Sequence, residues 1–133
     1  MSKQEILNQY GIKMLNKAIR ASLHGGQANS KIFSGGNQMD SFFDISYNDP
    51  NNINDEILTK VNYVLNGNTP PLSDIDSELS GLDTFAEVFP TEVRFYDFNT
   101  GDILQQVPLE HFKIIAEAWR DFLLQSPFNG AKI

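Results

Sequence analysis

Residues 92–125 read EVRFYDFNTGDILQQVPLEHFKIIAEAWRDFLLQ, and this stretch decides the fold that the sequence predicts. Val93 and Phe95 alternate with polar side chains, as on a strand with one buried face. The Asn-Thr-Gly that follows puts glycine where a tight turn favours a positive φ. We therefore predict an antiparallel hairpin with strands at 92–98 and 102–107.

An amphipathic helix is predicted directly after the hairpin. Pro108 opens it at the first turn, where a missing N–H costs nothing. Apolar residues then recur at spacings of three and four as far as about Gln125. Trp119 lies at the centre of this apolar stripe, so we expect it in the core.

The rest of the chain supplies shorter signals. A helix is predicted at residues 2–23, a flexible Gly/Ser/Asn-rich loop near 24–38, a strand at 40–48, a helix at 54–65 and an acidic connector near 68–84. In the first helix, Ser2 and Glu5 form a capping-box pattern, and the lysines and the arginine lie largely off the apolar stripe. Apolar residues between 79 and 89 are spaced as in a turn of helix.

This order of elements predicts a single α+β domain over residues 1–133, with a small antiparallel sheet and a C-terminal hairpin packed by three helices. Asp49-Pro50-Asn51-Asn52 is expected to end the strand at 40–48 with a turn, and Asn54 to cap the helix that follows. A length of 133 residues fits one domain.

Composition excludes several kinds of site. The chain has no cysteine, which rules out disulfides, thiolate metal clusters and cysteine nucleophiles, and its two histidines are too few for most zinc sites. No apolar run approaches the roughly 20 residues that cross a bilayer. The amino terminus lacks the layout of a secretory signal. We expect a cytoplasmic protein without metal or cofactor.

The net charge of −7 is distributed unevenly. Residues 1–31 carry five basic residues and one acid, for +4, whereas residues 32–92 carry one base and eleven acids, for −10. Residues 93–133 carry four bases and five acids. An acidic centre repels phosphate, which argues against direct nucleic-acid binding, and it attracts a basic partner. Solubility alone is an alternative explanation of this charge.

Seven acidic residues are the predicted partner-binding group, each as a charge partner for Lys or Arg. They are Asp44, Asp49, Asp55, Glu56, Asp74, Asp76 and Glu78. The acids that begin at Asp74 do not form a calcium loop, because Leu79 and Phe85 stand where such a loop needs Gly and Glu.

The stretch VRFYDFNTGDILQQVPLEHFKIIAEAWRDFL resembles the ending of small bacterial immunity proteins, which neutralise toxic domains of contact-dependent and related polymorphic toxin systems. The similarity lies in RFYD-x-x-TG, followed by a Pro-led helix that ends in Trp and aromatic residues. It implies a non-catalytic inhibitor that binds a cationic toxin domain, expected to be a nuclease, in a one-to-one complex. It transfers no binding residues.

Two other functions remain open at this stage. One is a structural or adaptor module of a phage or secretion system that self-associates through aromatic faces. The other is a small hydrolase or metabolite-binding domain that uses Asp97, Asp102 or His111. The second surface of interest, after the acidic residues, is the face of the hairpin that carries Arg94 and Tyr96, because helices that cover only one side of the sheet would leave it open.

Overall fold

The computed structural model describes residues 1–20, 26–68, 78–82 and 84–132. Its helices are α1 (Lys3–Gln9), α2 (Gln38–Ser41), α3 (Pro50–Asn52), α4 (Thr59–Leu65) and α5 (Leu109–Leu123), with π-helical segments η1 (Phe42–Ser46) and η2 (Ile53–Leu58). Its strands are β1 (Lys13–Arg20), β2 (Gln27–Ser34), β3 (Phe85–Val88), β4 (Glu92–Tyr96) and β5 (Ile103–Pro108). The predicted α+β class is confirmed.

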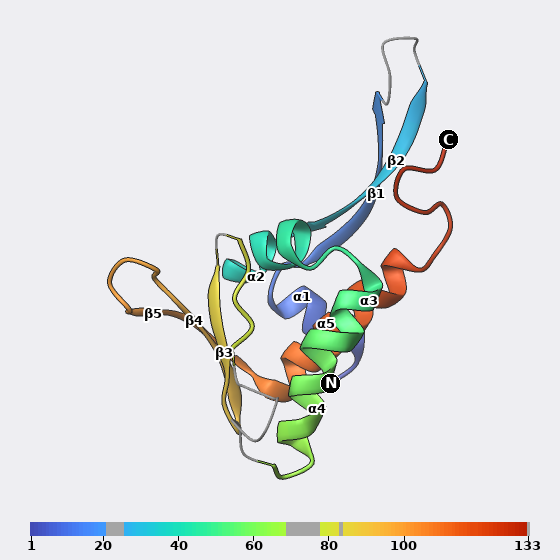
Figure 1. The fold of residues 1–133 in the computed structure, drawn as a ribbon. Helices are drawn as coiled ribbons and strands as arrows, with labels where there is room; N and C mark the ends of the chain where they lie inside the picture. The colour runs from blue at the N-terminus through green and yellow to red at the C-terminus, as the bar shows by residue number, and fades with distance from the viewer. Residues whose placement is uncertain (21–25, 69–77, 83, 133) are drawn as a thin grey trace.

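The strands form two separate antiparallel sheets, with the helices between them (Figure 1). β1 and β2 make a two-stranded arm, and β3, β4 and β5 make a three-stranded sheet in that order. The predicted hairpin is confirmed as β4 and β5, with an irregularity in register between Phe95 and Tyr96. Val93 and Phe95 are buried on one face of the sheet, where α5 packs, whereas Arg94 and Tyr96 are half-buried on the other.

α5 provides the centre of the core, as the apolar stripe predicted. Trp119 is fully buried, and its indole Nε1 donates hydrogen bonds to the carbonyl oxygens of Phe43 at 3.1 Å and Tyr47 at 2.9 Å. Aromatic rings from β2, η1, β4 and α5 pack together around it. The last helix therefore joins elements from most of the chain.

A helical segment runs from Pro50 to Leu65 and confirms the helix predicted at 54–65, with an earlier start. The expected cap and turn were wrong. Asp49 caps the helix by accepting a hydrogen bond from the backbone N–H of Asn51, and Pro50 occupies its first turn, where proline is favoured.

The long helix predicted at 2–23 is wrong beyond its first turns. Its capping box is confirmed, because Ser2 and Glu5 bond each other's backbone N–H groups. The helix then ends, and Gly11 takes a φ of +66°, a conformation that suits glycine. The chain continues as β1, which pairs with β2 along its whole length.

The loop predicted near 24–38 is also wrong over most of its length, because residues 27–34 are β2; residues 24 and 25 lie outside the described part. Phe33 is buried in the core, and Asn29 and Lys31 are buried although polar. Residues of the C-terminal tail cover the other edge of β2, where the backbone N–H of Asn29 donates to the carbonyl of Ala131 at 2.8 Å. These pairings are remote in sequence, so local composition did not reveal the strand.

The strand predicted at 40–48 is wrong, since this segment is helical as α2 and η1. A strand would place adjacent Phe42 and Phe43 on opposite faces, but both are fully buried. Met39, Phe43 and Tyr47 recur every four residues and are all buried, a helical signal that the aromatic composition obscured.

The helical turn expected near 79–89 is replaced by β3, where Ala86 and Val88 are buried against the core. Most of the predicted acidic connector, residues 69–77 and 83, lies outside the described residues.

Candidate functional site

Three of the predicted binding residues lie on one continuous helical segment. Asp49 caps it, and Asp55 and Glu56 belong to η2. All three side chains are exposed. Their position before and within the first turns of the segment is favourable, because the amino end of a helix stabilises negative charge. The segment therefore presents carboxylates to solvent without a cost to the fold.

Tyr47 links this segment to Glu78. Burial raises the pKa of the Tyr47 phenol above its ordinary value, and the charge and hydrogen bond of Glu56 and then the charge of Glu78 raise it further. Two carboxylates from separate elements thus act on one hydroxyl. Lys60 lies close by and donates from its Nζ to the backbone carbonyl of Glu78.

A hollow of about 520 Å³ lies beside these carboxylates. Its lining includes Tyr47, Glu56 and two apolar side chains that are well exposed, Ile45 at 50% and Leu82 at 85%. Gly81 allows the close approach of its loop to η1, because a Cβ there would lie 2.3 Å from Ser46 Oγ. We call Ile45, Tyr47, Glu56 and Leu82 the acidic hollow.

Asp44 is not part of this surface. It is half-buried, and its Oδ1 accepts a hydrogen bond of 2.9 Å from the backbone N–H of Phe33. Its carboxylate ties η1 to β2, and we leave it out of the binding group. Asp74 and Asp76 lie outside the described residues.

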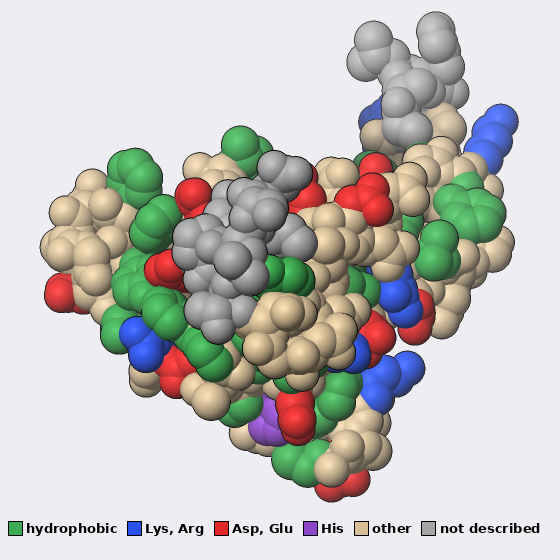
Figure 2. Space-filling model, turned by 60° about the horizontal axis from the view of Figure 1, so that its bottom comes forward, with side chains coloured by type: hydrophobic (Ala, Val, Ile, Leu, Met, Phe, Trp, Pro, Cys, Tyr) green, Lys and Arg blue, Asp and Glu red, His purple; other side chains and the backbone are tan. Residues whose placement is uncertain are grey.

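On the face shown in Figure 2, acidic side chains are spread out and do not gather in one patch, and Lys and Arg lie among them. The sequence suggested one broad acidic region over the centre of the chain. The described residues instead bring together a local group around Tyr47, so position in sequence did not translate into one continuous charged surface.

Asp97, Asp102 and His111, the residues of the enzymatic alternative, hold local structure. Asp97 Oδ1 accepts from the backbone N–H groups of Asn99 and Thr100, and Asp102 Oδ2 accepts from the Thr100 hydroxyl. His111 lies at the start of α5, where its Nδ1 is 2.9 Å from the Tyr10 hydroxyl. These bonds stabilise the hairpin turn and the contact between α1 and α5.

The open face of the three-stranded sheet is polar at one end and apolar at the other. At the polar end Arg94 donates to Glu92 at 2.7 Å and stacks over the Phe89 ring. At the apolar end Phe98 is 86% exposed, and hydrophobic side chains gather on this side of the molecule, at the left of Figure 2. Phe85 lines a small hollow together with Phe98 and Tyr96, and Ile103, which pairs with Tyr96 in the sheet, is also exposed. This apolar group was not predicted, because it needs the strand pairing.

Comparison with protein-family models, with curated proteins and with solved structures finds no match. Among the described residues, no three His, Asp or Glu side chains are grouped so that they could hold a metal ion. A search of the same residues finds no helix with the length and apolar character to cross a membrane.

Proposed function

We propose that this chain is an immunity protein, a non-catalytic inhibitor that binds a cationic toxin domain and blocks it. The observation that supports this best is the hollow in which the Glu56 carboxylate lies beside exposed Ile45 and Leu82. Apolar side chains next to carboxylates provide the two components of a protein interface, buried area and charge complementarity.

A Lys or Arg side chain of the partner suits the acidic hollow in both charge and apolar surface. Its charged end would be neutralised by Glu56, with Glu78 as a further charge of the binding group, while its aliphatic carbons would pack on Ile45 and Leu82. Asp49 and Asp55 belong to the same helical segment as Glu56, and we assign them to the margin of the interface, where exposed charges speed association more than they strengthen the complex. Asp74 and Asp76 belong to the same proposal as further charges.

The partner we propose is a nuclease domain, because such a domain uses basic side chains to hold phosphates. An acidic protein that occupies those side chains prevents substrate binding without any turnover. We place the complex in the cytoplasm and expect one copy of each protein in it.

The test compares two variants of equal charge change. One carries Asp49→Lys, Asp55→Lys and Glu56→Lys at the acidic hollow and its margin, and the control carries Glu110→Lys, Glu117→Lys and Asp121→Lys on α5. The wild-type protein is used to isolate its partner from host lysate at low salt. The association rate of each variant with the purified partner is then measured over a range of salt concentrations.

The first variant is expected to associate at least about tenfold more slowly than wild type, with a flatter salt dependence. The control should retain most of the wild-type rate. Equal rates for the two variants would reject capture by the acidic hollow, and a partner with an acidic surface would reject the proposed class.

The apolar end of the three-stranded sheet supports a second candidate, a structural or adaptor module that self-associates. Exposed Phe85 and Phe98 line one hollow and offer a patch that another copy could cover. Sedimentation equilibrium distinguishes the two functions. A stable oligomer that Phe98→Asp dissociates favours the second function, and a monomer favours the first.

A further inference from the structure

In the part of the chain that the structure describes, no strand lies beside the outer edge of β1. Within the described residues, β1 pairs only with β2, whose other edge is covered by the C-terminal tail. Every second residue of such an edge strand directs its N–H and C=O groups outward. β1 is eight residues long and exposed along nearly all of its length, so it offers a long row of backbone hydrogen-bonding groups.

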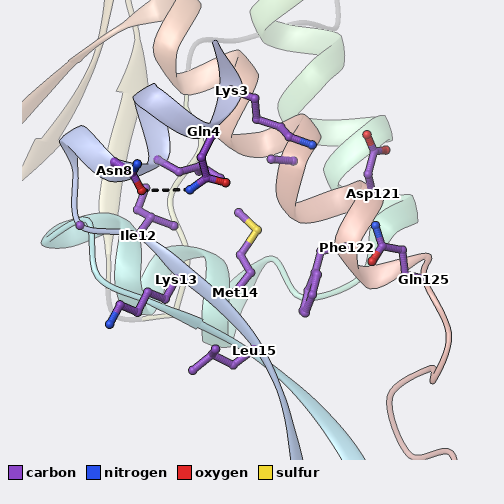
Figure 3. Close-up of a pocket in the computed structure, with 13 residues that line it drawn as sticks. Lys3, Gln4, Asn8, Ile12, Lys13, Met14, Leu15, Asp121, Phe122 and Gln125 are labelled. Carbon is purple, nitrogen blue, oxygen red and sulfur yellow. Dashed lines mark hydrogen bonds between the residues drawn. The ribbon is translucent and has the colours of Figure 1, made fainter. Parts of the chain in front are cut away.

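A groove of about 600 Å³ begins at this strand and lies between α1, β1 and the end of α5. Met14 points into it between α1 and Phe122, as Figure 3 shows. Leu7, Ile12 and Ala118 add apolar surface. A chain bound along the outer edge of β1 could therefore place alternate side chains in an apolar groove.

The charges around the groove are positive. Lys3 and Lys13 line it, and Lys17 and Arg20 continue along β1. The one acid in its lining, Asp121, is bonded to Arg120 at 3.0 Å. The groove thus has unbalanced positive charge, in contrast to the acidic hollow.

Lys31 adds a second positive feature behind the groove. Its side chain is almost fully buried, with 4% of the residue exposed, and its Nζ donates to Asn16 Oδ1 on β1 at 2.7 Å. The same Nζ lies 4.2 Å from the centre of the Phe122 ring, which lines the groove. No carboxylate among the described residues pairs with Lys31.

We propose that this groove binds an extended acidic segment of a partner protein, which adds to the outer edge of β1 as a new antiparallel or parallel strand. The backbone of the segment bonds to β1, its apolar side chains enter the groove beside Met14 and Phe122, and its carboxylates pair with Lys3 and Lys13. Strand addition of this kind takes affinity from main-chain hydrogen bonds and specificity from alternate side chains.

A second copy of this chain suits the edge of β1 less well than an acidic segment does, because β1 is itself positively charged. Pairing β1 with β1 would bring Lys13, Lys17 and Arg20 of one copy against the same residues of the other. Like charges on neighbouring strands are destabilising, and lysine on an edge strand is a common protection against self-pairing.

The experiment uses the whole chain and a phage library of random ten-residue peptides. Enriched peptides are expected to combine Asp or Glu with alternating apolar residues. The best one is labelled, and its affinity is measured by fluorescence anisotropy. The variant Lys3→Gln/Lys13→Gln should bind it about fivefold more weakly, as expected for the loss of two exposed ion pairs, whereas the control Lys113→Gln on α5 should bind it as the wild type does.

Methylation of alternate backbone nitrogens of the peptide tests strand addition without any change in the protein. Only one of the two alternate sets of N–H groups faces β1, so a peptide methylated on that set should lose binding, and a peptide methylated on the other set should keep most of it. The proposal is overturned if no acidic peptide is enriched, if the two methylated peptides bind equally well, or if both lysine variants behave alike. A dimer of the free protein with β1 amides protected from exchange would assign the edge to a second copy instead.

Discussion

Asp44 accepts a hydrogen bond from the backbone N–H of Phe33, eleven residues earlier in the chain. The bond joins η1 to β2 at a half-buried position. A carboxylate that the sequence places in the acidic centre of the chain is therefore used inside the fold, and this difference can be measured.

Asp44→Ala is expected to lower the free energy of unfolding by about 1–3 kcal/mol, because it leaves the Phe33 N–H without its charged acceptor. Asp55→Ala, at an exposed position of η2, should change it by less than about 0.5 kcal/mol. Urea denaturation followed by Trp119 fluorescence measures both. A smaller loss for Asp44→Ala than for Asp55→Ala would contradict the structural role of Asp44.

Trp119→Phe keeps an aromatic ring in the core but removes the N–H that bonds the carbonyls of Phe43 and Tyr47. We expect a loss of about 3 kcal/mol, since two buried carbonyl groups lose a partner. Circular dichroism during denaturation measures it. Tyr63→Phe, the control, should stay within about 0.5 kcal/mol of wild type; similar losses in both variants would show that the indole bonds contribute little.

Stability should fall at alkaline pH because of Tyr47. Its pKa is raised in the folded protein, so the folded state keeps a proton that the unfolded chain loses above about pH 10. The free energy of unfolding therefore decreases as pH rises past that value. Denaturation at several values between about pH 8 and about pH 11 should show a smaller decrease for Tyr47→Phe than for wild type. Equal decreases would place the Tyr47 phenol in an ordinary environment.

Two glycines with a φ of +90° should respond differently to alanine. A Cβ at Gly35 would lie 2.0 Å from the carbonyl oxygen of Gly11, whereas a Cβ at Gly67 meets nothing within 4 Å. Gly67→Ala should cost about 1–2 kcal/mol from backbone strain alone. Gly35→Ala should cost at least about 3 kcal/mol, because backbone atoms must also move. Thermal denaturation of the pair measures the difference, and equal midpoints would argue against close contact at Gly35.

The sequence predicted elements whose signal is local. The hairpin of β4 and β5 has its own turn, and α5 and the helix before Leu65 have clear apolar stripes. The sequence did not predict the arm of β1 and β2. Met14 and Phe33 belong to strands that are specified by each other and by the C-terminal tail. The prediction for the segment around Phe43 was wrong because adjacent aromatic residues suit a strand as well as a buried helix.

The candidate site, like the fold, was predictable only where its signal is local. Exposure of Asp55 and Glu56 follows from their place beside the apolar side of one helix. The place of Glu56 beside Tyr47 and Leu82 in one hollow depends on packing between segments that are remote in sequence. The groove beside β1 requires α1 and α5 as well, so no single stretch of sequence indicates it.

The order in which the aromatic core is assembled has a consequence for synthesis of the protein. Phe33, Phe42 and Phe43 leave the ribosome well before Trp119 and Phe112, which pack against them. During translation these early rings have no helix to cover them, and exposed apolar side chains favour aggregation. We expect the nascent chain to depend on rapid completion, or on a chaperone, until its last helix has emerged.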